Sequence, residues 1–288
     1  MGNTIALVEK YLADPANLNA VYKAASLTAD LEAPKVQFLG ANVVKLPTLS
    51  FGAAALGTYD KSAGFTAMDV TKAWTTYTLS QDKGNKLLLD AMDEEESAGE
   101  GAESGTGIIS FANEYIRQIV VPAIDTYRFA AMVTGTGTTV ELTSTAANVV
   151  AQLEAALQTF ADNEVPVEGA ILYMKPAVKT FLQTASTVSR YVSYGTGVNG
   201  EIDNRVVFFN GVRIVQVPAG RLGADVQFIL VQPRSVLSVV KHNPSYFFAR
   251  GTYPGMDADE IDYRLYYDFF VITNKNKGIY LQTVTGTE

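Results

Sequence analysis

Residues 58–84 read TYDKSAGFTAMDVTKAWTTYTLSQDKG, a stretch rich in strand-forming residues that shows no face resembling a protein interior. A half-buried strand alternates apolar and polar side chains, because successive residues point to opposite faces. Here Phe65 and Tyr77 share one side with threonines, whereas Met68 and Trp74 share the other side with Lys72. A two-stranded ribbon is marginal alone in water, so this one needs support from a larger sheet of its own chain or from another subunit.

The ribbon belongs to a longer extended segment, residues 43–89, whose tip is rich in glycine. Before it, residues 1–45 carry one short helical pattern, in which Ile5, Val8 and Leu12 fall on one face. This helix is expected to end at the first proline, and the rest of the arm is expected to have no core of its own.

A long helix is expected from about residue 107 to residue 132, after an acidic run at 93–96 whose charge suits a helix N-terminus. Apolar residues recur in it at spacings of three and four, which gives one continuous packing stripe. Pro122 lacks an N–H, and its ring clashes with the carbonyl of Gln118. The sequence therefore predicts a bend at this proline.

The second half of the chain mixes helical and strand patterns. The dipeptide Asn210-Gly211 predicts a hairpin, because both residues tolerate the positive φ angles of a type I′ turn. A strand is expected at 261–273, and a turn at 275–278 is expected to return it through 279–284. The other expected elements are helices at 146–161 and 176–184, strands at 170–174, 206–209, 212–217, 226–231 and 236–240, and a polar loop at 190–205. This mixture indicates the α+β class.

The composition limits the kinds of partner. The 288 residues include 30 acidic and 22 basic side chains, a formal charge of −8, without a cluster of Lys and Arg. Such a chain lacks the phosphate-neutralising patch of a sequence-specific nucleic-acid binder. Cysteine is absent, so no disulfide framework or thiolate metal site is expected. The sequence shows neither a signal peptide nor a membrane-spanning run, which predicts a soluble protein made in a cytoplasm.

Several short motifs match those of enzymes, but their contexts do not suit the chemistry. Gly195, Gly197 and Gly200 have the spacing of a dinucleotide-binding loop, but a strand pattern follows where a helix is needed. Ser238 and Lys241 have a nucleophile spacing that works on a helix, whereas the β-branched residues around them predict a strand.

The sequence also shows no clear set of residues for binding a metal ion or transferring a proton. Asp257, Asp259 and Asp262 lack the glycine and the distal glutamate of a calcium loop, so they suggest a solvated acidic turn. His242 is the single histidine, which excludes a histidine pair as metal ligands. We therefore expect no cofactor, no metal and no enzymatic activity, while the acidic residues leave a hydrolase built on a carboxylate pair as an alternative.

Several further motifs mark the first half of the chain. They are Leu46-Pro47, GTYD at 57–60, Gly64-Phe65, WTTYTLSQD at 74–82, MDEE at 92–95 and VVPAIDTYRFA at 120–130. Together with the order of the elements, these motifs resemble the major capsid proteins of tailed bacteriophages, which share the Hong Kong 97-type fold. The resemblance covers most of the chain in layout and is specific from about residue 43 to residue 132.

The resemblance implies an α+β fold with an N-terminal arm, an extended hairpin called the E-loop, a peripheral domain with a long spine helix, and an axial α/β domain. In this family the E-loop lies over a neighbouring subunit, so both faces of the ribbon could be buried by different chains. The implied boundaries are 1–45 for the arm, 46–89 for the E-loop, 90–135 and 236–288 for the peripheral domain, and 136–235 for the axial domain.

The resemblance also implies which residues meet other subunits. These are Lys61, Phe65, Met68, Lys72, Trp74 and Tyr77 on the ribbon, with Arg190, Tyr194, Asn199 and Arg205 in the axial domain. No covalent cross-link between subunits is expected, because Lys61 and Lys72 have no recognisable partner asparagine or assisting glutamate.

The implied partners are copies of the same chain, arranged as pentamers and hexamers in the icosahedral shell of a virion. The shell would enclose double-stranded DNA without sequence-specific binding and would assemble in the cytoplasm of a bacterial host. The chain carries no long N-terminal scaffolding segment, so a separate scaffolding protein or none is expected. A portal and decoration proteins would be further partners.

Other functions compete with this interpretation. The shell protein of an encapsulin-like compartment shares the fold but encloses enzyme cargo. A monomeric carboxylate-dependent hydrolase would require the ribbon to pack within its own chain. Other virion proteins, such as tail-tube or adhesin subunits, tend to be all-β, and the two amphipathic helices between 146 and 184 disfavour them.

Overall fold

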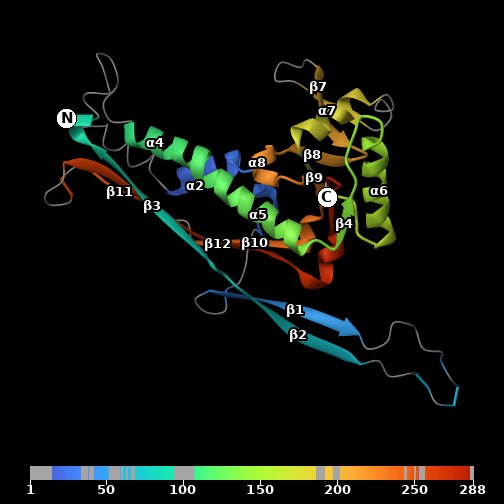
Figure 1. Cartoon of the computed structure of the whole chain (residues 1–288). Coiled ribbons are helices and arrows are strands. Elements are labelled where there is room, and N and C mark those ends of the chain that lie inside the picture. The colour runs from blue at the N-terminus through green and yellow to red at the C-terminus, as the bar shows by residue number, and fades with distance from the viewer. Residues whose placement is uncertain are drawn as a thin grey trace. The chain divides into compact units, whose positions relative to one another are not determined.

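The computed structural model describes residues 15–33, 38, 42–51, 59, 61–62, 64–65, 69–93, 107–185, 192–196, 202–242, 245–249, 251–252 and 257–285. The chain divides into two compact units. The smaller unit is Ala33–Gln81, and the larger unit combines Met1–Glu32 with Asp82–Glu288. A two-stranded ribbon forms the smaller unit, and two sheets with the described helices form the larger one (Figure 1). The predicted α+β class is confirmed.

A helical rod runs through the larger unit (Figure 1). It consists of α4 (Gly107–Tyr115), a π-helical segment (Ile116–Val120) and α5 (Val121–Gly135). Pro122 lies in the first turn of α5, where its missing N–H costs little. Where the sequence predicts a bend, the structure has a π turn, in which the N–H of Val121 bonds to the carbonyl of Ile116. The π turn lets the helix continue through the proline.

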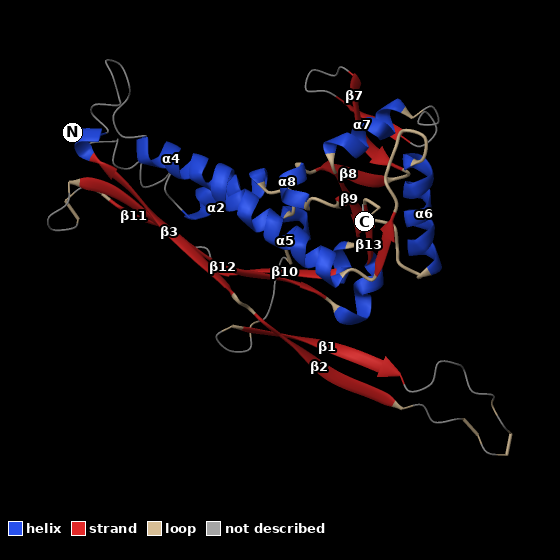
Figure 2. Ribbon diagram, viewed as in Figure 1, coloured by secondary structure: helices blue, strands red, loops and turns tan. Residues whose placement is uncertain are grey.

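A seven-stranded mixed sheet forms one part of the larger unit (Figure 2). Its order is β4 (Thr138–Glu141), β13 (Ile279–Thr283), β9 (Val226–Val231), β5 (Ile171–Met174), β8 (Val212–Gln216), β7 (Ile202–Phe209) and β6 (Val192–Thr196). The predicted hairpin joins β7 to β8, and Asn210 and Gly211 have φ angles of 46° and 82°. These positive angles confirm the turn chemistry that the dipeptide indicates.

Helices bury both faces of this sheet. On one face, α6 (Val149–Asp162) and α7 (Pro176–Thr184) share a core with Leu172 and Leu230. On the other face, α5 and α8 (Ala219–Leu222) share a core with the intervening strand residues, such as Tyr173. All six residues of β9 are buried, which explains why five of them are apolar without alternation.

The second sheet is centred on β12 (Ala258–Val271), which pairs with β10 (Val236–His242), β11 (Ser245–Phe248) and β3 (Gln81–Asp90). Alternate residues of β12 from Ile261 to Tyr267 enter a core that also contains residues of α2 (Pro15–Ala25), α4 and the π turn. This alternation is the expected pattern for a sheet with one covered face.

Three expectations fail because partners distant in sequence decide the structure. The arm does have a core segment, since Pro15 begins α2 and Leu18 and Tyr22 of that helix are buried. The expected polar loop at 190–205 contains β6 and the first part of β7. The chain after residue 278 does not return along β12, because β13 pairs with β9 and β4. The helical pattern at residues 5–12 lies outside the described residues.

A buried charge network joins the segment after α2 to the rod. Arg128 of α5 is fully buried, and its guanidinium donates to Thr28 Oγ1 at 2.9 Å and to Glu32 Oε1 at 2.8 Å. The Tyr22 hydroxyl donates to the same Glu32 oxygen at 2.7 Å. Burial acts to lower the pKa of Arg128, but Tyr22, Glu32 and Asp125 more than offset it, so the pKa lies above its ordinary value. The guanidinium is therefore a permanent buried cation.

Asp125, one turn before Arg128, provides the second acidic centre of the network. It is fully buried and accepts hydrogen bonds from Ser26 Oγ at 2.8 Å and Thr28 Oγ1 at 2.7 Å. Arg221 of α8 adds a guanidinium at 3.3 Å. The network thus pairs two arginines with two carboxylates and fixes the segment 26–32 against both α5 and α8.

Candidate subunit interface

The candidate interface is built on an antiparallel ribbon, β1 (Val43–Phe51) and β2 (Val70–Thr78). Its register places Pro47 opposite Trp74 and Leu49 opposite Lys72. Directly opposed residues of an antiparallel pair project to the same face. The extended run that the sequence predicts after the tip is therefore two strands, since β2 completes this ribbon whereas β3 joins the sheet of β12.

One face of the ribbon carries large apolar side chains in an exposed position. Trp74 is 56% exposed, and Leu49 and Val70 are each 57% exposed. The register places all three on the same face. An exposed apolar row on an element without a core is typical of a surface that another chain covers.

The opposite face of the ribbon is more covered and more polar. Val44 is buried, and Tyr77, which lies directly opposite it, is half-buried. Further along, the hydroxyls of Thr48 and Thr75 form a cross-strand hydrogen bond of 2.7 Å. The two faces therefore differ, and the face with Trp74 carries the more exposed apolar side chains.

The described residues of the tip form a small aromatic cluster. The rings of Tyr59 and Phe65 lie 4.9 Å apart at 52°, and Phe65 is 89% exposed. Gly64, just before Phe65, has a φ of 82°, which an L side chain rarely adopts. This glycine permits the backbone turn that presents Phe65 to solvent.

Charge on the ribbon lies next to its aromatic anchor. The ammonium of Lys72 lies 5.2 Å from the centre of the Trp74 ring, within the range of a cation–π contact. Lys61 is exposed near the tip. Burial by a partner would strengthen the Lys72–Trp74 contact, because water would then screen it less.

The structure places only some of the predicted interface residues. Met68, Arg190 and Asn199 lie outside the described residues. Tyr194 lies on β6 and Arg205 on β7, so the structure brings their backbones onto neighbouring strands, where Tyr194 pairs with Val206. The sequence analysis missed Leu49 and Val70. An assumed pairing of residues 43–51 with 70–78 would have found them, because it places them beside Trp74.

The motifs that match those of enzymes and metal sites can be located in part. None of the described residues form a group of three or more His, Asp or Glu side chains that could hold a metal ion. Ser238 and Lys241 lie on strand β10, so the predicted strand is confirmed there. Asp259 and Asp262 also lie on a strand, β12, rather than in the solvated turn that the sequence suggests. Within the described residues, no helix is long and apolar enough to cross a membrane.

Comparisons with solved structures identify the fold. The capsid of cyanophage P-SCSP1u superposes with a TM-score of 0.69 at 11% identity, covering 91% of this chain and 89% of that chain. The mature capsid of bacteriophage PhiM1 gives a TM-score of 0.61 at 14% identity over 86% and 83% of the two chains. A virus-like particle from Pyrococcus furiosus gives a TM-score of 0.54 at 12% identity over 92% and 97%.

These likenesses cover nearly the whole of each chain, so the chain has the Hong Kong 97-type capsid fold. No protein-family model matches the sequence, and no curated protein matches it either. The fold is thus similar in three dimensions, although few residues are identical in sequence.

Proposed function

We propose that the chain is the major capsid protein of a tailed bacteriophage, which assembles as pentamers and hexamers into an icosahedral shell around double-stranded DNA. The observation that carries the proposal is the ribbon, which presents Trp74, Leu49 and Val70 to solvent on one face of a two-stranded sheet. The capsid fold supplies the context in which a neighbouring subunit would cover that face. The role is structural rather than enzymatic.

The proposed division of the chain follows the capsid fold. Residues 1–45 would form the arm, 46–89 the E-loop, 90–135 with 236–288 the peripheral domain, and 136–235 the axial domain. The seven-stranded sheet supports an axial domain that also takes in Ile279–Thr283, since β13 lies between β4 and β9. Assembly in the host cytoplasm, with scaffolding, portal and decoration proteins as partners, belongs to the same proposal.

A compartment shell that encloses protein cargo is the alternative from the sequence analysis, and the likeness to a virus-like particle does not favour it over a phage head. Particle mass from light scattering and negative-stain images would first establish whether closed shells or rings form. The nucleic-acid content of shells purified from infected cells would then separate the two candidates, because a phage head contains DNA and a compartment contains protein.

Replacement of Trp74 by Ala tests the ribbon as an interface. Truncation of an aromatic anchor costs about 2 kcal/mol or more, roughly a thirtyfold weaker contact. We expect the concentration needed for assembly to rise while the stability of the free subunit is retained. Tyr246→Ala, which truncates an aromatic residue that is 55% exposed on β11, is the matched control. Equal effects of the two variants on assembly would contradict the proposed interface.

A further inference from the structure

Two 3₁₀ turns lie side by side where the two sheets of the larger unit meet. η4 (Pro233–Ser235) connects β9 of the seven-stranded sheet to β10 of the second sheet, and η5 (Thr273–Gly278) connects β12 of the second sheet to β13. β9 pairs with β13, and β10 pairs with β12, so both connections pass between the sheets at the same end. The fold therefore brings two segments that are far apart in the sequence onto one surface.

Backbone hydrogen bonds hold the two turns together. The N–H of Gln232 donates to the carbonyl of Gly278 at 2.8 Å, and the N–H of Ile272 donates to the carbonyl of Ser235 at 3.0 Å. A Cβ at Gly278 would lie 2.0 Å from Ser235 Oγ, so only glycine permits this close approach. The two turns thus form one continuous surface with a fixed backbone.

Three exposed cations project from this surface, Arg234 on η4 and Lys275 and Lys277 on η5. Within the part of the chain that the structure describes, none of these three side chains forms an ion pair. Their charges are therefore available to a partner. The sequence shows no cluster of Lys and Arg here, because the fold alone brings the two turns together.

The segments that build this surface contain no acidic residue. The chain has 30 acidic residues, but residues 226–256 and 269–287 have neither Asp nor Glu. One acidic residue reaches this end of the sheet from another element, since the exposed Glu168 has its carbonyl 3.1 Å from Gln232 Nε2. The surface thus has a local excess of positive charge on a chain whose formal charge is −8.

We infer that Arg234, Lys275 and Lys277 bind the phosphate backbone of the duplex DNA inside the shell, so that η4 and η5 face the interior. This inference rests on the proposed function. Cations on two adjacent turns can neutralise phosphates without reading base edges, which matches binding without sequence preference. Three contacts are few for a DNA-binding protein, so they would position the DNA without holding it tightly.

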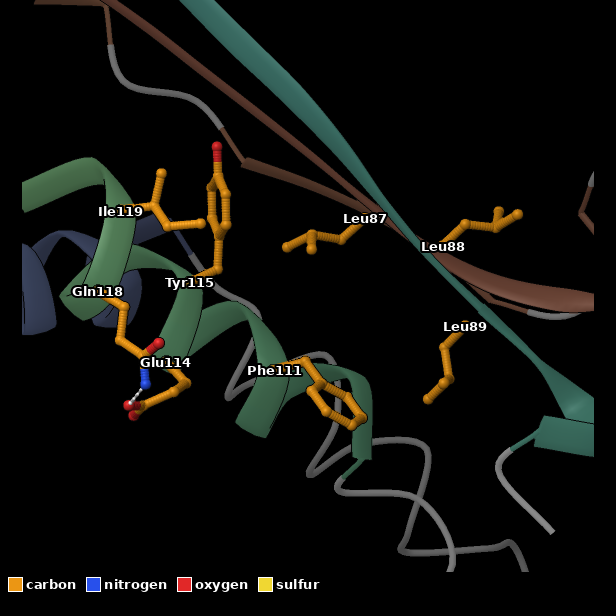
Figure 3. Close-up of a pocket in the computed structure, with 8 residues that line it drawn as sticks. All are labelled: Leu87, Leu88, Leu89, Phe111, Glu114, Tyr115, Gln118 and Ile119. Atoms are coloured by element: carbon orange, nitrogen blue, oxygen red, sulfur yellow. Dashed lines mark hydrogen bonds between the residues drawn. The ribbon is translucent and has the colours of Figure 1, made fainter. Parts of the chain in front are cut away.

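The pocket between β3 and the rod offers no comparable surface. Its lining is mostly apolar, and the charged residue in it is Glu114, which accepts a hydrogen bond from Gln118 (Figure 3). A carboxylate at this position repels phosphate. Exposed cations on the same two elements, Lys83 of β3 and Arg117 of the π turn, are therefore suitable controls.

The inference is tested by duplex binding to the unassembled subunit, measured as the fluorescence anisotropy of a labelled duplex. Three phosphate contacts predict roughly a fortyfold loss of affinity between about 50 mM and 200 mM salt. The triple variant Arg234→Gln/Lys275→Gln/Lys277→Gln should bind more weakly and lose nearly all of this salt dependence. Glu168→Gln should strengthen binding, because it removes a repulsive charge beside the turns.

The matched control is Lys23→Gln/Lys83→Gln/Arg117→Gln, which removes equal charge from α2, β3 and the π turn. We expect it to retain the salt dependence of the unmodified chain, and circular dichroism verifies that each variant is folded. Equal losses in the two triple variants would overturn the inference, because binding would then follow net charge alone. Binding of a glutamate-rich peptide but not of the duplex would also overturn it, since the partner would then be an acidic protein.

The assay separates this inference from the proposed function, because the subunit is not assembled when it is measured. Closed shells with DNA inside, formed by a subunit that does not bind the duplex, would overturn the inference alone. Duplex binding by a subunit that never forms shells or rings would instead overturn the proposed function.

Discussion

Removal of the buried guanidinium by Arg128→Met should destabilise the subunit strongly. The methionine fills part of the space but leaves Glu32 as a carboxylate without its cation, and Thr28 loses a donor to its hydroxyl. Loss of one partner of a buried ion pair costs about 3–5 kcal/mol, because the remaining charge is then desolvated without compensation. We expect a loss of this size in the free energy of unfolding, measured by urea denaturation of the unassembled subunit.

Two comparisons make this prediction specific. Arg264→Met removes an exposed arginine whose guanidinium contacts Asp82 at 2.5 Å, and we expect little change because water screens that pair. The double variant Arg128→Met/Glu32→Gln should recover part of the loss, because it removes the stranded charge as well as its partner. The reasoning would be refuted if Arg128→Met cost no more than Arg264→Met, or if the second substitution added its full separate cost.

Two further predictions concern the larger unit. Burial raises the pKa of Asp262, and the charge of Glu260 and a hydrogen bond to it act in the same direction. Ionisation of Asp262 therefore opposes folding as the pH rises above the ordinary value of 3.8, where the unfolded chain releases the proton first. Asp262→Asn should stabilise the subunit at neutral pH, and urea denaturation across pH should show the gain disappearing near pH 3.8. A methyl group at Gly137 would meet the carbonyl oxygen of Asn276 at 2.6 Å, so Gly137→Ala should cost about 1–3 kcal/mol in thermal denaturation. Gly220→Ala in α8 meets nothing within 4 Å and should be neutral or stabilising; comparable losses would contradict the packing argument.

The sequence predicts the local elements of this fold well. The helix expected at 176–184 is confirmed at both ends as α7, because Pro176 suits a first helical turn. The hairpin at Asn210 and Gly211 is confirmed for a similarly local reason, the positive φ angles of both residues. In each case the residues that decide the structure lie within the element itself.

The missed features depend on partners that are remote in the sequence. β13 lies between β4 and β9, and nothing in residues 279–283 distinguishes that position from a return along β12. α2 is a buried helix because Leu18 and Tyr22 meet the rod, whereas a lone pattern of this length is a weak signal. On the ribbon, missing alternation identified Trp74 and Phe65, but Leu49 required the cross-strand register.

The strand pairing of the ribbon also affects whether newly synthesised subunits aggregate. Within the part of the chain that the structure describes, β1 and β2 form a two-stranded sheet, and a single bridge between Phe38 and Val44 is the further pairing of β1. Most of each strand therefore has an outer edge of backbone N–H and C=O groups. Such edges recruit further strands, and charged residues or proline counter this. Pro47 removes one donor from β1, and Lys45 and Lys72 add charge that a second ribbon would have to bury. These residues of the ribbon therefore disfavour edge-to-edge pairing with the ribbon of another copy. The apolar face of the ribbon remains available to a complementary surface on a partner.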